Sequence, residues 1–111
     1  ELDFKTAAQW YRRAAEQGFP EAQYSLGFLF YDGLGVAKSF DEAVKWYRLA
    51  VAQDHASALF DLGVCHAYSE GVPRDIHEAL RLWKRAAARG HARAAAAVDT
   101  LLEQLAAARA A

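Results

Sequence analysis

The tripeptide Trp10-Tyr11-Arg12 returns as Trp46-Tyr47-Arg48, 36 positions further along the chain. The same interval aligns further residues without a gap: Phe4 with Phe40, Ala7 with Ala43, Ala14 with Ala50, Gln17 with Gln53, Leu26-Gly27 with Leu62-Gly63, and Gly35-Val36 with Gly71-Val72. A fixed period of this length indicates stacked units of secondary structure, each of which buries its apolar face against its neighbours. We therefore expect a repeat protein whose function lies on the surface that the repeats share.

Composition and charge are those of one small helical domain. Hydrophobic residues make up 54% of the 111 residues, enough for a core, and only two prolines interrupt helix formation. The net charge of −1 provides no field that would attract nucleic acid or an anionic membrane. Cys65 is the only cysteine, so it forms neither an internal disulfide nor a Cys-based zinc site. We expect no signal peptide and no transmembrane segment, and nothing in the sequence selects between cytoplasm and periplasm.

Apolar residues at three- and four-residue steps predict helices of two alternating types. The first type, which we call B helices, is expected at residues 3–17, 39–53 and 75–90. The second type, which we call A helices, is expected at residues 21–31 and 56–69. Glycines at the boundaries between these segments predict tight turns, because glycine adopts positive φ without steric cost.

Two of the B helices carry a start signal. Ser39 and Asp75 precede the helices, and Glu42 and Glu78 follow them by three residues. This spacing is typical of a capping box, in which the two side chains bond to each other's backbone amides. We therefore expect both helices to begin at these residues.

Residues 91–111 begin in the A pattern and then depart from it. Asp99 stands where Gly27 and Gly63 stood, and helix-favouring residues replace the glycine turn. We therefore expect a C-terminal capping helix that ends the array. Its apolar stripe is predicted to comprise Val98, Leu101, Leu102 and Leu105, and its water-facing residues Arg93, Asp99, Glu103 and Arg109.

The first B helix has no A helix before it in the sequence. Its aromatic residues Phe4, Trp10 and Tyr11 would then show the apolar face that such a partner should cover. We expect either that further repeats precede this helix or that it pairs with another copy to give a homodimer.

These residues resemble the Sel-1-like repeat family, a branch of the tetratricopeptide-like helical solenoids. The family pattern reads here as Ala22, Leu26, Gly27, Phe30, Gly33, Gly35, Val36, Ala43, Trp46, Tyr47, Ala50 and Val51. The following repeat keeps the spacing but has His66 for the aromatic residue, Ser69 for the first turn glycine and Leu82 for the tryptophan.

The resemblance implies an all-α, right-handed superhelix of 36-residue helix-turn-helix repeats in a single domain. Its parts would be a partial first repeat at 3–18, repeats at 19–54 and 55–90, and the capping helix at 91–111. It also implies a protein-binding adaptor or scaffold with no enzymatic activity, and together with the abundant alanine it favours a bacterial source.

Several repeated residues have structural roles in this interpretation. Glycine inside a helix costs roughly 1 kcal/mol relative to alanine, so Gly27 and Gly63 are explained if a neighbouring helix needs the space of a Cβ atom. Large aromatic side chains stabilise a small core more than any other residue type. The predicted core aromatic residues are Trp10, Tyr11, Trp46, Tyr47 and Trp83.

The resemblance also locates a candidate binding surface. In tetratricopeptide-like arrays the concave surface is formed mainly by A helices, at the positions that flank the Leu-Gly pair. The corresponding partner-binding residues here are Glu21, Tyr24, Phe28, Tyr31, Ser57, Phe60, Val64 and Ala67. They predict an apolar, aromatic groove for an extended or helical segment of a partner protein. The alternative is that Tyr24 and Phe28 only cover the seam between repeats.

A Cys-dependent hydrolase is the main alternative from another class. Asp61, Cys65 and His66 supply an acid, a nucleophile and a base on one predicted helix. Adjacent helical residues point about 100° apart, however, so His66 is poorly placed to accept the Cys65 proton. Some cysteine-rich relatives have been described as binding or hydrolysing β-lactams, but their paired cysteines are missing here.

Two other groups of residues are weaker functional candidates. A basic stripe on the last B helix suits its helix dipole as well as an acidic partner, and consists of Arg81, Lys84, Arg85 and Arg89. His55 and His91 occupy the same repeat position at a turn, where capping or packing explains them better than metal binding. We expect no nucleic acid, no metal and no cofactor, and a purely structural or self-associating segment is the remaining alternative.

Overall fold

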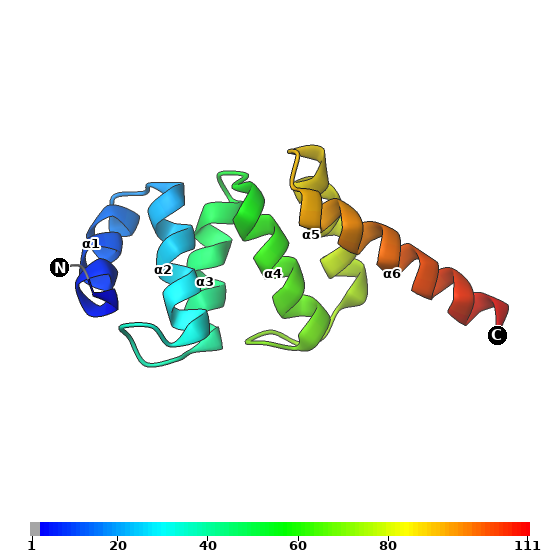
Figure 1. Ribbon diagram of the computed structural model, residues 1–111, viewed down its shortest axis with the longest axis horizontal. Helices are drawn as coiled ribbons and strands as arrows, with labels where there is room; N and C mark the ends of the chain where they lie inside the picture. Colours follow the sequence, from blue (N-terminus) through cyan, green and yellow to red (C-terminus); the bar gives the residue numbers. More distant parts are fainter. Residues whose placement is uncertain (1–2) are drawn as a thin grey trace.

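The computed structural model describes residues 3–111, which form a stack of helices (Figure 1). The helices are α1 (Phe4–Glu16), α2 (Pro20–Asp32), α3 (Phe40–Val51), α4 (Ala56–Tyr68), α5 (Ile76–Ala88) and α6 (Ala92–Ala110). The described chain contains no strand and measures 53 × 25 × 23 Å along its principal axes. This elongated shape confirms the predicted all-α solenoid.

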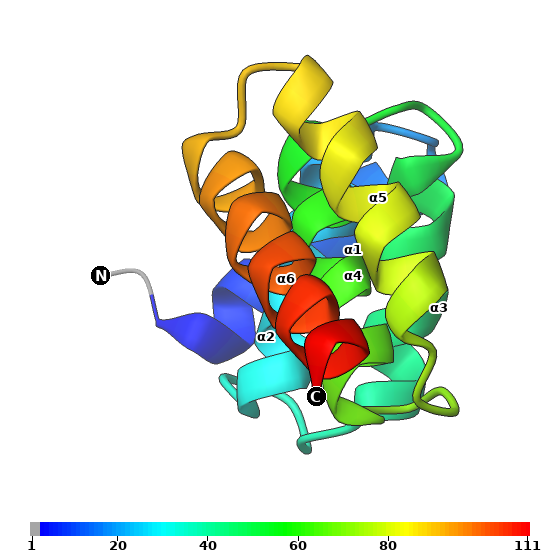
Figure 2. The ribbon, with the colours of Figure 1, turned by 90° about the vertical axis from the view of Figure 1, so that its right-hand side faces the viewer.

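Packing follows the order of the sequence. The closest helix pairs are α2 with α3 and α4 with α5, which are the two A–B pairs of the repeats. Figure 2 shows α2, α4 and α6 on one side of the stack, while α3 and α5 lie on the other. The A helices therefore share one face of the molecule, and any groove along that face is formed mainly by their side chains.

The predicted capping boxes are only half formed. The Ser39 hydroxyl accepts a hydrogen bond from the backbone amide of Glu42 at 3.1 Å. An Asp75 carboxylate oxygen accepts one from the backbone amide of Glu78 at 3.0 Å. Their own amides do not bond to the glutamate side chains, because they donate to the carbonyls of Phe30 and His66, each at 2.9 Å. This exchange joins the end of each A helix to the start of the next B helix.

Gly27 and Gly63 leave space for an aromatic ring of the neighbouring helix, as predicted. A Cβ atom on Gly27 would lie 2.8 Å from the Tyr47 ring, and one on Gly63 would overlap the Trp83 indole. Tyr47 and Trp83 are 36 positions apart, so the same contact is used twice. The Cβ-free position therefore lets α3 and α5 each pack an aromatic side chain closely against the preceding A helix.

The predicted aromatic core is confirmed in the inner repeats but wrong at the N-terminus. Trp46 and Tyr47 are 5% and 1% exposed, whereas Trp10 and Tyr11 are 61% and 39% exposed. The physical reason is the missing neighbour, because α2 covers α3 and no described helix covers α1 in the same way.

The prediction for the last helix needs one correction. Leu101 is buried and Val98 and Leu105 are half-buried, but Leu102 is 43% exposed because no described helix covers it. Arg93 is exposed, as predicted, and its guanidinium also contacts an aromatic ring. It lies 4.9 Å from the centre of the Phe60 ring.

Candidate functional site

Three hollows follow one another along the side of the stack that the A helices share. The N-terminal hollow, of about 350 Å³, lies between α1 and α2, and the central hollow, of about 210 Å³, lies mainly between α2 and α4. The C-terminal hollow, of about 620 Å³, lies between α4, α5 and α6. Tyr24 and Phe28 line both the first and the second, and Phe60 and Arg93 line both the second and the third. Neighbouring hollows share lining residues, and we call this row of three hollows the groove.

The repeat explains why the hollows recur. Each hollow is lined by a B-helix aromatic residue and by two A-helix residues, and each set is spaced by 36 positions. The B-helix series is Tyr11, Tyr47 and Trp83, and the A-helix series are Tyr24, Phe60 and Ala96, and Phe28, Val64 and Thr100. The backbone geometry of one repeat therefore places the same positions in every hollow, while the side chains at those positions differ.

The N-terminal hollow is apolar. Its lining is Phe4, Ala7, Tyr11, Tyr24, Ser25, Phe28 and Leu29. Phe4, Tyr11 and Phe28 are 55%, 39% and 39% exposed. This hollow therefore offers aromatic surface to a ligand without any charged side chain.

The central hollow contains a partly buried acid, Asp61. The Tyr24 hydroxyl donates a hydrogen bond to a carboxylate oxygen of Asp61 at 2.9 Å, and the Tyr24 ring stacks on Tyr47 with 5.7 Å between ring centres. Burial raises the pKa of Asp61 above its usual range, although the Tyr24 hydrogen bond and the charge of Arg93 act in the opposite direction. Burial, and then the neighbouring Asp61 charge, also raises the pKa of the Tyr24 phenol. The phenol therefore stays protonated and acts as the donor.

Tyr31 makes a second tyrosine–carboxylate contact between the A helix α2 and the next repeat. Its hydroxyl donates to a carboxylate oxygen of Glu70 at 2.6 Å, and its pKa is raised by burial and by this hydrogen bond. Both contacts tie α2 to the following repeat. They therefore hold the wall of the central hollow in place.

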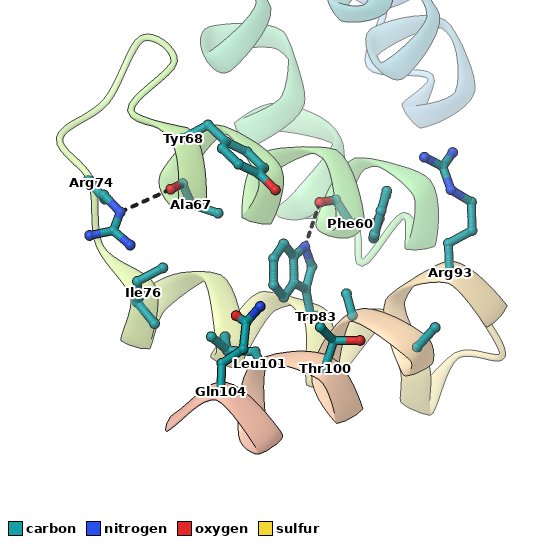
Figure 3. A pocket seen from close by; sticks show the side chains of 12 residues that line it. Phe60, Ala67, Tyr68, Arg74, Ile76, Trp83, Arg93, Thr100, Leu101 and Gln104 are labelled. Atoms are coloured by element: carbon teal, nitrogen blue, oxygen red, sulfur yellow. Dashed lines mark hydrogen bonds between the residues drawn. The ribbon is translucent and has the colours of Figure 1, made fainter. Parts of the chain in front are cut away.

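The C-terminal hollow has an aromatic floor (Figure 3). The Trp83 indole N–H donates to the Phe60 carbonyl at 3.0 Å, which leaves the rest of the ring as apolar surface. The Arg74 Nε donates to the Ala67 carbonyl at 3.2 Å, and the Arg93 guanidinium lies over the Phe60 ring. This hollow therefore combines an apolar floor with two cationic groups.

The two turn histidines have the capping and packing roles that their repeat position suggests. His55 Nδ1 accepts the Ala58 amide and His91 Nδ1 accepts the Ala94 amide, each at 3.1 Å. The His55 ring stacks on Tyr24 and the His91 ring on Phe60, with ring centres 5.0 and 4.8 Å apart. These histidines set the position of the groove aromatics.

The structure brings most of the predicted binding residues together. Five of them line the central hollow: Tyr24, Phe28, Tyr31, Phe60 and Val64. Ala67 lines the C-terminal hollow, whereas Glu21 and Ser57 line none of the three hollows. Glu21 instead pairs with His55 at the rim.

Two features of the predicted groove need correction. Phe60 and Ala67 are only 7% and 9% exposed, so they form floor and wall and offer little contact surface. The groove is also not purely apolar, because Asp61 and Arg93 line it. Phe60 is buried because His91 and Arg93 cover its ring.

Sequence reasoning missed Arg93 and Thr100, although the repeat contained the signal. Arg93 stands at the same repeat position as Glu21 and Ser57, and Thr100 at that of Val64. Extending the predicted lining by one more interval of 36 would have reached both. Sequence reasoning considered Asp61 only as a catalytic acid, because it lies at the repeat position of Ser25, which is not part of the family pattern.

Burial argues against the hydrolase hypothesis. Cys65 is fully buried, and this burial raises the pKa of its thiol to about 12. A nucleophilic cysteine needs a thiolate near neutral pH and access for its substrate. Cys65 therefore behaves as a packed thiol that fills the core between the helices.

Three of the four cations in the basic stripe on α5 form ion pairs with acids of the protein itself. Arg81 pairs with Glu78 at 2.6 Å, and both Arg85 and Arg89 reach Asp54, at 3.2 and 2.9 Å. These pairs are half-exposed, so their effect on stability is small. Their geometric effect is to connect α5 to the turn after α3.

Residues 3–111 contain no group of three or more His, Cys, Asp or Glu side chains arranged to hold a metal ion. Within the same part of the chain, none of the helices is both long and apolar enough to cross a membrane.

Comparison with known proteins identifies the family. The Sel1 repeat model matches residues 1–19, 20–55 and 56–91. A Sel1 repeat protein from Oxalobacter formigenes is 43% identical over 88% of this chain and 40% of its own, with a TM-score of 0.83. A protective antigen of uropathogenic Escherichia coli with an SLR fold is 36% identical over 83% of this chain and 20% of its own, with a TM-score of 0.81.

A more distant structure shares the fold alone. Cysteine-rich protein B of Helicobacter pylori is 21% identical over 80% of this chain and 67% of its own, with a TM-score of 0.75. Comparison with curated protein sequences gives no significant match. The chain thus spans 40% and 20% of the length of the two more similar structures, and all three relatives are bacterial, in agreement with the predicted source. Since three matches of the repeat model together cover residues 1–91, the chain belongs to the Sel1 repeat family.

Proposed function

We propose that the chain binds a segment of a partner protein in the groove formed by its three hollows. Sel1 repeat proteins are generally protein-interaction modules. The observation that carries the proposal is that equivalent positions of successive repeats line successive hollows. A segment with regularly spaced apolar side chains would place one side chain in each hollow.

Phe28 is the strongest anchor point of this groove. It is 39% exposed and lines both the N-terminal and the central hollow. Exposed aromatic surface near the middle of an interface contributes more binding energy than the polar rim. The neighbouring Tyr24 is held by Asp61 and His55, so its ring is already ordered before a partner arrives.

The proposal is tested by crosslinking from two positions of similar exposure. A photoreactive phenylalanine analogue at Phe28 should capture a discrete partner from a bacterial lysate. The same analogue at Leu49, which is 43% exposed on α3 and lines none of the three hollows, serves as the matched control.

The binding step is then measured with Phe28→Glu and Leu49→Glu. We expect Phe28→Glu to weaken binding of the captured partner at least tenfold, because a desolvated carboxylate replaces an apolar anchor. Leu49→Glu should change the affinity less than twofold. Equal capture from both positions, or equal loss in both variants, would rule out the groove as the binding site.

Self-association through α1 is the second candidate. Phe4 and Trp10 are 55% and 61% exposed, and together with Tyr11 they leave α1 with an uncovered aromatic surface, which Phe19, the 58% exposed N-cap residue of α2, adjoins in sequence. A second copy that covered this surface would bury apolar area now in contact with water. Light scattering across dilution should then show a dimer that Trp10→Ser dissociates. A monomer at every concentration would remove this candidate.

A further inference from the structure

The C-terminal hollow differs from the other two in its charge. Its lining contains Arg74 and Arg93 and no carboxylate. The central hollow contains Asp61 as well as Arg93, and the N-terminal hollow contains no charged residue. The groove is therefore apolar at one end and cationic at the other.

The two arginines remain available to a ligand. The ion pairs found within residues 3–111 use His55, Arg81, Arg85 and Arg89, so neither Arg74 nor Arg93 is engaged in one. Arg74 is positioned by the bond from its Nε to the Ala67 carbonyl, which leaves both of its terminal nitrogens free for an acceptor.

Arg93 is positioned by an aromatic ring instead of by a hydrogen bond. Its guanidinium lies 4.9 Å from the centre of the Phe60 ring, and stacking on a ring leaves the edge of the guanidinium open to a carboxylate. Figure 3 shows Arg74 and Arg93 at opposite ends of the hollow, with Trp83 between them.

Apolar side chains line the hollow between the two arginines. Phe60, Trp83 and Leu101 are 7%, 8% and 7% exposed and form the base of the hollow, while Tyr68 is 71% exposed and adds an accessible aromatic side chain to this apolar lining. Thr100 and Gln104 add hydrogen-bonding groups on the α6 side. A free phosphate or a nucleic acid backbone would meet the arginines but would leave this base uncovered. A protein segment with mixed acidic and apolar side chains would satisfy both.

We infer that the C-terminal hollow binds an acidic peptide segment, which inserts an apolar side chain onto Trp83 and places carboxylates at Arg74 and Arg93. This inference rests on the proposed function, because it names the chemistry of the partner that the groove receives. Carboxylates pair with guanidinium groups in two-point geometry, and paired sites at the two ends would set the register of the segment.

The test is a selection of random ten-residue peptides displayed on phage. We expect the wild-type protein to enrich sequences in which acidic residues flank a leucine or an aromatic residue. The charge-reversed variant Arg74→Glu/Arg93→Glu should instead enrich lysine and arginine at the flanking positions. Circular dichroism checks that the variants keep the helical fold.

A matched control has the same change in net charge. Arg48→Glu/Lys84→Glu reverses two exposed cations that line none of the three hollows, and it should enrich the same acidic peptides as the wild type. The best acidic peptide should bind the wild type and the control within twofold of each other. It should bind the Arg74→Glu/Arg93→Glu variant at least tenfold more weakly.

Each outcome of the selection decides the inference. Enrichment without acidic residues, no enrichment at all, or the same acidic preference in all three proteins would overturn it. These failures leave the proposed function standing if the crosslink from Phe28 still captures a partner. The proposed function itself would be wrong if the Phe28 crosslink captured no partner and Phe28→Glu did not weaken the binding of the selected peptides.

Discussion

Helices α1 and α3 carry the same Trp-Tyr-Arg tripeptide, but only one of them buries it. Trp46 and Tyr47 are 5% and 1% exposed, whereas Trp10 and Tyr11 are 61% and 39% exposed. The difference lies in what packs on each helix, because α2 covers α3 and no described helix takes the equivalent place on α1. In a solenoid, the same local sequence therefore acts as core or as surface according to its neighbours.

The largest expected effect tests this comparison directly. Tyr47→Ala removes a ring that packs on Gly27 and stacks on Tyr24, and should lower the free energy of unfolding by about 3–5 kcal/mol. Tyr11→Ala should lower it by less than about 1 kcal/mol, because this ring is already partly hydrated. Urea unfolding followed by circular dichroism measures both. Similar losses for the two variants would show that α1 is covered in solution.

A second comparison concerns one repeat position occupied by Gly63 in α4 and Asp99 in α6. Gly63→Ala should lower the free energy of unfolding by about 1–3 kcal/mol, because the added methyl group overlaps the Trp83 indole. Asp99→Ala should raise it by a few tenths of a kcal/mol, because Asp99 is exposed and alanine is the better helix former.

Thermal unfolding of both variants gives the sign of each change. Opposite signs would confirm that the B helix partner, and not the glycine itself, sets the requirement at this position. A stabilising Gly63→Ala change would contradict the close packing of Trp83.

The smallest expected effect concerns the acid of the central hollow. Burial raises the folded-state pKa of Asp61, so the folded protein holds this proton more tightly than the unfolded chain does. The stability linked to Asp61 is therefore complete below the unfolded pKa of about 3.9 and decreases as the pH rises through the folded value. Asp61→Asn should remove this decrease.

The measurement is the free energy of unfolding of Asp61→Asn and wild type between pH 3 and pH 7. The variant should gain stability relative to the wild type as the pH rises, with the two closest at pH 3. Asp32→Asn, at an exposed position, reports the general effect of removing one negative charge. A constant difference across the range would show that Asp61 is not the group responsible.

The sequence predicted the helices well because their signals are local. Apolar spacing, capping residues and turn glycines act within a few residues, and the six helices of residues 3–111 begin and end within a few residues of the predicted ranges. The capping boxes failed in their second half for a non-local reason. The amides of Ser39 and Asp75 donate to carbonyls of the preceding A helix instead of to their own glutamates.

The candidate site was predictable only in part. Positional equivalence within the repeat placed Tyr24, Phe28 and Val64 along one face, and the structure brings them into one hollow. It did not show that Asp61 would lie beside Tyr24, because that contact joins side chains from different repeats. It also did not separate buried Phe60 from exposed Phe28, because the covering His91 and Arg93 belong to the next helix.

The sequence by itself determined the repeat, the helices and the family, because a fixed interval and local hydrogen-bonding preferences are independent of what surrounds each segment. Only the tertiary structure decided which repeated residues are core, which line the groove and which no described helix covers. The physical reason is that burial and charge pairing depend on neighbouring side chains. Trp10 and Trp46 have the same local sequence, but only Trp46 has a helix to cover it.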